Sequence, residues 1–151
     1  MTLQYEDIFS AFFSKITDYS FLEYDDSTSR EMLVSWLHST ASSPRLGNKF
    51  SLFTMDDEEA VLSFSLKNPT GTQADNEFVI DILAKGMVVA WLEPQVKTVL
   101  LTKQLLSGGD ERFYAQANHL SQLQQMLSSA KTELNNTLRD YGYLHNSYIE
   151  G

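Results

Sequence analysis

A seven-residue repeat in the C-terminal third of the chain constrains its fold more than any other feature. Apolar residues recur there at the interval that covers one side of a helix along its whole length. The repeat consists of Phe113, Leu120, Leu127, Leu134 and Tyr141, and the positions three residues later are Gln116, Leu123, Ala130, Thr137 and Leu144. A helix from Asp110 to Tyr141 is about 48 Å long at ~1.5 Å per residue. Because that length exceeds the width of a small domain, part of the helix should stand clear of its own core or pack on another chain.

The repeat predicts a contact between subunits, with packing inside the chain as the alternative. We assign this intersubunit seam to Phe113, Leu120, Leu123, Leu127 and Leu134. Gln116 and Thr137 interrupt the apolar positions, which argues against a simple zipper of leucines.

Two helices are predicted near the N-terminus. Residues 5–16 carry large apolar side chains at three- and four-residue spacing, with Thr2 as a candidate cap. This is a core helix, or else Phe12 or Phe13 faces another subunit. A second helix should start at residues 26–28, with Glu31 completing a capping box on Thr28, and end at residues 42–44.

A third helix is predicted from Asp75 or Asn76 to about Leu92. Its apolar residues surround it almost completely, which is typical of a central, buried helix. The core positions of this helix are Phe78, Ile82, Leu83, Gly86, Met87 and Trp91. Gly86 is unfavourable in a helix by ~1 kcal/mol relative to Ala, so another backbone should approach it closely. Pro94 should stop or kink the helix and begin a fourth, which ends at Gly108 and Gly109.

Residues 49–66 predict a small β-hairpin. Apolar residues alternate with polar ones around Phe50 and Leu52 and again at Leu62, Phe64 and Leu66. The acidic run 56–59 between them is a solvated turn, with a helix starting at Asp56 or loose divalent-cation binding as alternatives. A lone hairpin is marginal in water, so it should lie on the helices or pair with a neighbouring subunit.

Composition limits the classes of function. The 151 residues suit one domain, and the absence of cysteine excludes thiol chemistry and thiolate metal sites. The net charge is -9, and residues 1–75 carry -7 of it. Basic residues are never adjacent, so a groove that grips nucleic acid is not expected. No stretch is apolar enough to span a membrane and no leader is visible, so synthesis in the cytoplasm is expected.

No catalytic, cofactor-binding or metal-binding residues are predicted. His38, His119 and His145 stand in different predicted segments without the spacing of metal ligands. Motifs for binding phosphates or nucleotides are also missing from the sequence. An enzyme is therefore the weakest interpretation of this chain.

The last ten residues, 142–151, are unusually aromatic for a terminal tail. Tails without a binding partner are usually polar, whereas aromatic residues dominate the energies of interfaces. We assign a docking tail with anchors at Tyr141, Tyr143, Leu144, Tyr148 and Ile149. Folding of the tail back onto the domain is the alternative.

Three stretches resemble a known family. They are the segment Tyr5-Glu6-Asp7-Ile8-Phe9, residues 82–96 around Gly86 and Pro94, and residues 113–120 leading into the long helix. Together these stretches are similar to small structural proteins of tailed bacteriophages that infect Gram-positive bacteria. Members of that family are described as neck, adaptor or head–tail connector proteins.

The resemblance implies a structural role in the virion neck. Such adaptors are assembled in the host cytoplasm as a ring of about twelve copies beneath the portal protein, and they join the capsid to a downstream connector, stopper or tail protein. DNA passes through the central channel, and the C-terminal tail docks onto the portal. A wall that DNA passes should be acidic, so carboxylates rather than Lys85, Lys97 or Lys103 should line the channel.

Two other non-catalytic roles remain possible at this stage. One is a helical regulatory or interaction protein that binds a partner through its long helix. The other is a tail-terminator protein, although that class is usually rich in β-structure. The predicted fold is mainly α: a helical bundle with one long C-terminal helix and a small β-hairpin, forming one domain over residues 1–141 followed by the docking tail.

Overall fold

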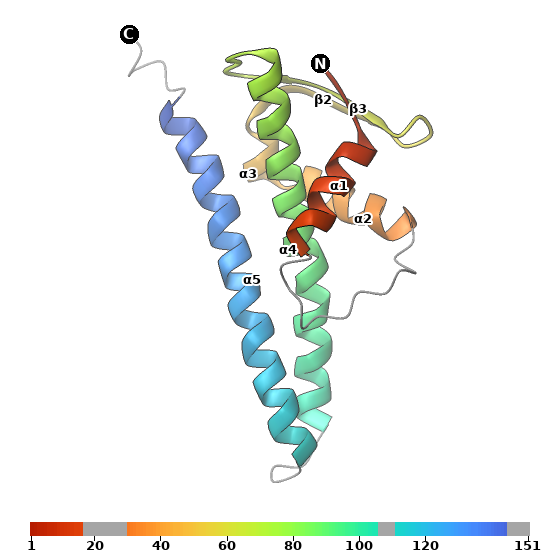
Figure 1. Cartoon of the computed structure of the whole chain (residues 1–151), viewed down its shortest axis with the longest axis vertical. Helices are drawn as coiled ribbons and strands as arrows, with labels where there is room; N and C mark the ends of the chain where they lie inside the picture. Colours follow the sequence, from red (N-terminus) through yellow and green to blue (C-terminus); the bar gives the residue numbers. More distant parts are fainter. Residues whose placement is uncertain (17–29, 106–110, 145–151) are drawn as a thin grey trace.

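The computed structural model describes residues 1–16, 30–105 and 111–144, with the backbone alone at Phe113 and 142–144. These residues form five helices and a three-stranded antiparallel sheet, so the prediction of a mainly α fold with a long C-terminal helix is confirmed (Figure 1). In chain order the elements are β1 (Thr2–Gln4), α1 (Tyr5–Ile16), α2 (Arg30–Ala41), α3 (Pro44–Gly47), β2 (Phe50–Asp56), β3 (Val61–Leu66), α4 (Thr72–Leu105) and α5 (Glu111–Leu144).

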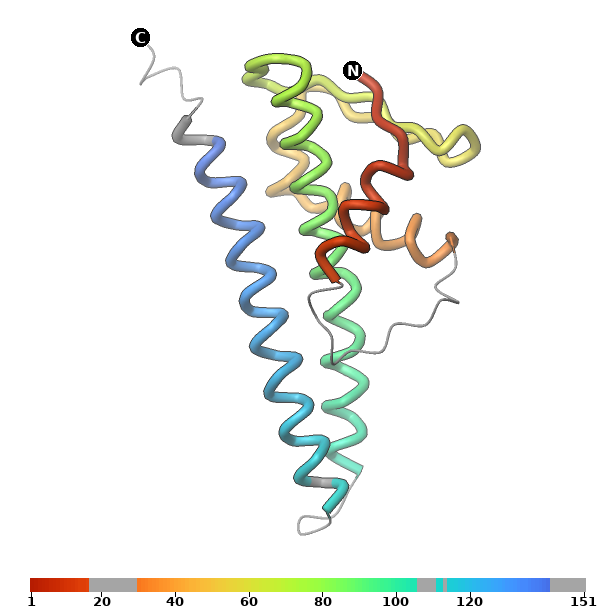
Figure 2. The backbone as a smooth tube through the Cα atoms, in the orientation of Figure 1, coloured from red at the N-terminus to blue at the C-terminus, as the bar shows by residue number. Residues whose placement is uncertain are grey.

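The described part of the chain has a head and an arm. In the head, α1, α2, α3 and the sheet gather around the N-terminal half of α4 (Figure 2). The arm comprises residues 95–105 of α4 and 111–127 of α5, which lie side by side and extend away from the other described elements (Figure 1). The long helix therefore does stand clear of most of the domain, as its length predicts, but α4 accompanies it.

The sheet contains the predicted hairpin and one strand that the sequence does not reveal. β2 and β3 pair antiparallel, and β1 adds to the other side of β3 with Leu3 opposite Leu62. Thr2 therefore belongs to a strand, and its prediction as a helix cap is wrong. Three residues are too few to display alternation, and what holds them is pairing with β3, about 60 positions away.

The acidic run connects the two strands of the hairpin. Asp56 ends β2, and the next four residues form a turn that closes at Ala60 with a φ of 56°. A helix starting at Asp56 is thereby excluded. The side of the sheet that bears Phe50, Leu62 and Phe64 is buried in the same core as the helices, so the hairpin is supported within the chain.

The N-terminal helices supply much of that core. In α1, Phe12 is fully buried and Phe13 is partly buried against the core, so Phe12 acts as a core residue rather than facing another subunit. In α2, Leu33 and Leu37 are buried, whereas Met32 is exposed. The predicted caps of α2 at residues 26–28 lie outside the described residues.

The third and fourth predicted helices are one continuous helix, α4. Proline in a helix removes one backbone hydrogen bond and usually kinks or ends the helix, yet α4 runs through Pro94 to Leu105. Neighbouring side chains add hydrogen bonds to the carbonyls on either side: Gln95 donates to Trp91 (3.1 Å) and Thr98 donates to Pro94 (2.9 Å). With α5 packed along α4 as well, α4 does not stop at Pro94, so the prediction of a stop there and of a separate fourth helix is wrong.

The first turn of α4 begins at Thr72, earlier than predicted. Asp75, which was expected to start the helix, is buried in its first turn. Its carboxylate accepts hydrogen bonds from the backbone N–H and the hydroxyl of Thr70 (3.1 and 2.9 Å). This contact fixes the connection between β3 and α4 in the way that side-chain capping fixes a helix end.

The core of α4 is centred on Gly86. Ile82, Leu83, Met87 and Trp91 are buried around it, and Phe78 is partly buried. The element that approaches Gly86 closely is the side chain of Thr40 in α2, not a backbone. Close helix packing therefore explains the glycine, as expected, but the group that approaches it is a side chain rather than a backbone.

The apolar seam of α5 packs within the chain. Leu120 and Leu123 are buried, and Leu127 and Leu134 are partly buried against the core. The principal neighbour of α5 is α4. Their burial corrects the intersubunit assignment of these four residues: they form an intrachain contact, which was the alternative. The side chain of Phe113, the fifth seam residue, lies outside the described ones.

Candidate functional site

The described residues offer surfaces rather than a reaction centre. Among them, no three His, Asp or Glu side chains are close enough to hold a metal ion. The arrangements that remain are a polar layer between α4 and α5, an acidic turn joined to α1 and α2, exposed leucines on the arm, and a cavity over Gly86.

The polar layer joins three helices through Lys85. Its ammonium group contacts Asp81 in the preceding turn (2.8 Å) and donates a hydrogen bond to Thr137 of α5 (2.8 Å). Lys15 of α1 contacts the other oxygen of Asp81 (3.0 Å). Since Lys85 is largely buried, these bonds hold α5 at one position along α4.

Asp81 is ionised more readily than an ordinary aspartate. Burial would by itself raise the pKa of its carboxyl group, but the hydrogen bonds from Lys85 and Lys15 outweigh burial and lower the pKa below 3.8. Lys85 and Asp81 therefore form an ion pair between successive turns of α4, and Lys15 extends it to α1. Lys85 is thus engaged by contacts within the chain.

Tyr141 fastens the C-terminal part of α5 to the head. Its ring stacks on Phe78 with centroids 4.1 Å apart, and its hydroxyl donates a hydrogen bond to the carbonyl of Asn68. Burial, together with the charge of Asp75, raises the pKa of the Tyr141 hydroxyl. Tyr141 is 7% exposed, so its assignment to a docking tail is wrong, and it is a residue of the domain.

The remaining anchors of the predicted tail are only partly covered by the structure. α5 continues to Leu144, which places the backbone of Tyr143 and Leu144 in the helix. Tyr148 and Ile149 lie outside the described residues. The boundary between domain and tail therefore moves from residue 141 to residue 144.

The acidic turn is tied to the head by Asp57. Its carboxylate accepts a hydrogen bond from the buried Tyr5 hydroxyl (2.6 Å) and lies 2.8 Å from the Nε2 atom of His38. These two hydrogen bonds lower the pKa of Asp57, while burial, followed by the bond to Asp57, raises the pKa of Tyr5. Asp56 is also engaged, because it accepts the backbone N–H groups of Glu58 and Glu59 (both 3.1 Å). The turn is thus a structural joint between α1, α2 and the hairpin.

The arm carries three exposed leucines. Leu101 and Leu105 on the last turns of α4 are 61% and 87% exposed, and Leu100 is 38% exposed. Tyr114 at the start of α5 is also exposed. We call Leu100, Leu101 and Leu105 the arm leucines. Apolar side chains gathered on a projecting element are a typical feature of protein contact sites.

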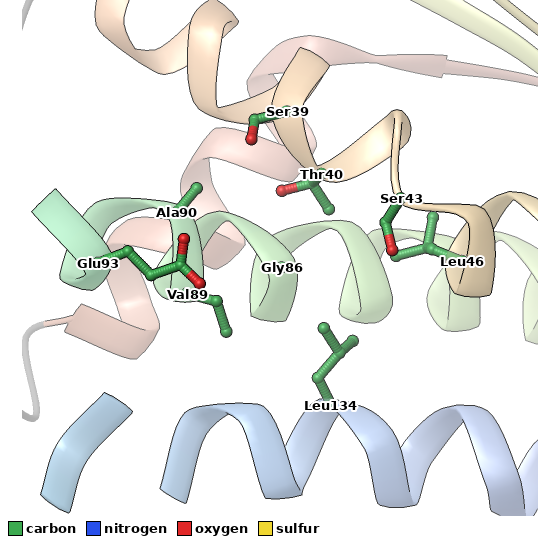
Figure 3. A pocket seen from close by; sticks show the side chains of 9 residues that line it. All are labelled: Ser39, Thr40, Ser43, Leu46, Gly86, Val89, Ala90, Glu93 and Leu134. Carbon is green, nitrogen blue, oxygen red and sulfur yellow. The ribbon is translucent and has the colours of Figure 1, made fainter. Parts of the chain in front are cut away.

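A cavity of about 220 Å³ lies over Gly86, between the α2–α3 segment and α5 (Figure 3). Leu46, Val89 and Leu134 provide apolar walls, and Ser43 and Glu93 add polar groups. Figure 3 shows Leu134 pointing from α5 toward α4, opposite Thr40 and Ser43. The seam residue Leu134 therefore lines part of this cavity.

Several of these contacts have no signature in the sequence. Tyr5, His38 and Asp57 stand in three separate elements, and only the fold brings them together. Lys85 and Thr137 are 52 residues apart. The interruption of the heptad by Thr137 was the one available signal, because a polar residue at a seam position needs a polar partner.

The charge is divided between head and arm. Residues 1–94 contain 15 acidic and 6 basic side chains, which accounts for the whole of the -9, whereas residues 95–151 contain 5 of each. Of the former, the described residues 1–16 and 30–94 carry 11 acidic and 6 basic side chains. The head is therefore acidic, and the part of the chain that includes the arm is neutral. A neutral, leucine-bearing arm approaches another protein at a lower electrostatic cost than the head does.

None of the described helices is both long and apolar enough to cross a membrane. Searches against protein-family models, curated proteins and solved structures give no match to this chain.

Proposed function

We propose that this chain is a structural, non-catalytic assembly protein: a head–tail connector adaptor of a tailed bacteriophage, located in the virion neck. In this role, about twelve copies form a ring beneath the portal protein, and the ring joins the capsid to the downstream connector, stopper or tail protein. DNA passes through the ring without sequence-specific contacts. The family assignment rests on the sequence resemblance described above.

The observation that carries the proposal is the arm with its exposed leucines. Two antiparallel helices of 34 residues each run through the head, and their far ends project from it as the arm. Such a protomer presents long sides to neighbours in a ring, where contacts between different surfaces generate a closed cycle. Because the seam of α5 is covered by α4, we assign the contact between copies to the arm leucines instead.

The acidic head supports the same role. A protein surface near moving DNA should not retain it, and negative charge repels the phosphate backbone. The turn at residues 56–59 places four carboxylates together at one end of the hairpin. We assign the DNA-facing wall to the head for this reason, and an interior lined by Lys97 or Lys103 would contradict the assignment.

The decisive experiment is capture by the portal protein encoded near this chain. Full-length chain and a chain ending at Leu144 are each co-expressed with that portal, and bound material is measured by mass photometry. We expect only the full-length chain to bind and to form rings. Equal binding by both chains would reject the docking tail, and binding by neither would reject the connector function.

A matched pair of variants tests the arm. Leu101→Ser combined with Leu105→Ser should abolish ring formation on the portal, while Leu52→Ser in β2 serves as the control. Leu52 is 52% exposed, close to the 61% of Leu101, but lies in the head. Since all three side chains are exposed, none of the changes should lower the urea midpoint noticeably. Loss of rings in the control alone would place the contact on the head.

The alternative function is that of a helical interaction protein that binds a host factor. The buried seam weakens this alternative, because the apolar face of the long helix is already occupied by α4. Such a protein would remain monomeric or dimeric in the presence of the portal. The capture experiment therefore separates the two roles.

A further inference from the structure

The outer edge of β2 is open for pairing with another strand. The sheet has the strand order β1-β3-β2, so β2 pairs with β3 on one side and, among the described residues, with no strand on the other. Proline and lysine, which commonly protect such edges, are absent from residues 50–56. One irregularity lies near Ser51, and residues 52–56 are in continuous register with β3.

Two residues of this regular part turn both of their backbone groups toward the open side. Phe64 of β3 uses its own groups on the β1 side, where its N–H donates to the Met1 carbonyl (2.8 Å) and its carbonyl accepts from the Met1 ammonium (3.0 Å). Phe53 lies opposite Phe64. Opposite residues in an antiparallel pair either exchange both hydrogen bonds or point both groups apart. The N–H and C=O of Phe53 therefore point away from β3, as do those of Met55, two residues further along.

These groups match a second copy of the same strand. Phe53 and Met55 flank Thr54, so two antiparallel β2 strands related by a two-fold axis at Thr54 bring Phe53 of each copy opposite Met55 of the other. This register makes four backbone hydrogen bonds and leaves out the irregular Ser51. Contacts between methionine sulfur and an aromatic ring are favourable. Both side chains are only partly buried within their own chain, and the second copy would cover more of them.

Charge favours the antiparallel orientation. The basic residues Lys49 and Lys67 lie at the end of the hairpin away from its turn, where the Lys67 N–H donates to the Lys49 carbonyl (3.0 Å). The acidic run 56–59 lies at the turn. Antiparallel pairing places the basic end of each hairpin beside the acidic end of the other. It also separates the two copies of Asp57 by six positions, or about 20 Å, well beyond the Debye length of about 8 Å at physiological salt.

We propose that the free protein forms a two-fold dimer through its β2 edges, which joins two three-stranded sheets into one sheet of six strands. The contact lies in the head and is separate from the arm leucines. A cyclic ring is generated by contacts between different surfaces, so a two-fold contact between identical edges has no place within it. The dimer is therefore a state that precedes assembly, and it protects the open edge from pairing with other strands. This inference concerns the free chain and does not depend on the connector function.

Disulfide trapping tests the dimer, because the natural chain contains no cysteine. Thr54 and Leu52 are both exposed and lie on the same face of β2. In the proposed register the two Thr54 residues form a non-hydrogen-bonded pair with Cα atoms about 4.5 Å apart, a separation that a disulfide spans. The two Leu52 residues are offset by four positions, about 13 Å, which is too far. Leu52→Cys is therefore the matched control for Thr54→Cys.

In a buffer with oxidised glutathione, we expect Thr54→Cys to form disulfide-linked dimers at least about tenfold faster than Leu52→Cys, because a preformed contact raises the effective concentration of the thiols. Equal rates of linkage, or faster linkage of Leu52→Cys, would overturn the proposal.

A proline substitution tests the backbone contact itself. Met55→Pro removes the N–H that faces the open edge and leaves the hydrogen bonds to β3 in place, whereas Met55→Ala removes only the side chain. Added to Thr54→Cys, the proline should slow linkage to the rate of Leu52→Cys, and the alanine should slow it less. Urea unfolding of the reduced proteins checks that both variants fold. Equal linkage rates for the folded proline and alanine variants would show that the β2 edge is not the contact.

Discussion

At the scale of single residues, the contact between Gly86 and Thr40 governs how closely α2 approaches α4. A Cβ atom at position 86 would lie 2.1 Å from the Thr40 Cγ2 atom and 3.0 Å from its hydroxyl oxygen. The hydroxyl is itself fixed, because it donates to the carbonyl of Trp36 (2.9 Å). The threonine therefore cannot turn away without losing a hydrogen bond.

We predict that Gly86→Ala destabilises the protein, although alanine is the better helix former by about 1 kcal/mol. Steric overlap in a packed core costs about 1–3 kcal/mol, so the free energy of unfolding should fall in urea titrations. Thr40→Ser removes the Cγ2 atom and keeps the hydroxyl. The double variant should accordingly be more stable than the sum of the single effects predicts. A more stable Gly86→Ala protein would refute the close contact.

Asp81 determines part of the pH dependence. Since its pKa is lowered in the folded state, ionised Asp81 stabilises the fold above its ordinary pKa of 3.8, and this contribution is lost as the pH falls through the lowered value. Asp81→Asn should be less stable at neutral pH by about 0.5–1 kcal/mol, a small value because solvent screens a partly exposed pair.

The same variant should lose less stability than the natural chain between neutral pH and acid. Acid titrations followed by circular dichroism measure that difference. Glu31→Gln, which removes an exposed carboxylate at the start of α2, is the control and should leave the acid transition in place. Identical acid transitions for Asp81→Asn and the natural chain would contradict the role of Asp81.

At the scale of elements, α4 is unusual because it contains a proline without ending. Pro94 is exposed and stands where the head passes into the arm. The helix is continued by hydrogen bonds from Gln95 and Thr98 and by packing against α5. These contacts offset the lost backbone hydrogen bond but do not restore it.

Pro94→Ala should therefore stabilise the protein, by up to about 3 kcal/mol. The effect should appear as a higher urea midpoint with an unchanged slope, since the surface exposed on unfolding stays the same. Pro69→Ala, outside the helices, provides a comparison for removing a proline without gaining a helical hydrogen bond. Destabilisation by Pro94→Ala would mean that the proline sets the direction of the arm and is needed for its packing.

The elements also show which parts of the fold can be predicted from sequence patterns. The periodicity of apolar residues was sufficient to predict α1, the hairpin and the length of α5, because each of these elements buries one face. It failed for β1, whose three residues are held by a distant strand, and for Pro94, where a local rule is overridden by the neighbouring helix. The repeat in α5 correctly marks a covered face but carries no information on whether the covering helix belongs to the same chain.

The candidate sites were less predictable than the fold. Tyr141 is the type of residue that anchors interfaces, but its burial, its stacking on Phe78 and its hydrogen bond to Asn68 make it a core residue. The cavity over Gly86 is formed by three segments that are distant in sequence. Neither feature depends on spacing along one helix, which is the quantity that sequence periodicity reports.

At the scale of the whole molecule, the separation of an acidic head from a neutral arm predicts how copies associate. In the proposed ring, contacts through the arm would bring neighbouring heads together, and the like charges of the heads would repel one another. Screening shortens the range of that repulsion from about 30 Å at 0.01 M salt to about 3 Å at 1 M.

Self-association should therefore strengthen as salt is raised, which sedimentation velocity measures directly. Glu58→Gln with Glu59→Gln removes two charges of the exposed turn and should reduce this salt dependence. Association that weakens with salt would instead indicate attraction between the acidic head of one copy and the basic residues of the arm on another.

The pairing of β1 with β3 has a consequence for the order of folding. The hairpin of α4 and α5 can grow from the short connection at its end, and β2 meets β3 across a four-residue turn, so both begin from neighbouring residues. β1 must wait for a strand about 60 residues further along, although it is synthesised first. Contacts between distant residues form slowly because the intervening chain must first be closed into a loop. The N-terminal strand should therefore be among the last elements to acquire protection in pulse-labelling hydrogen exchange.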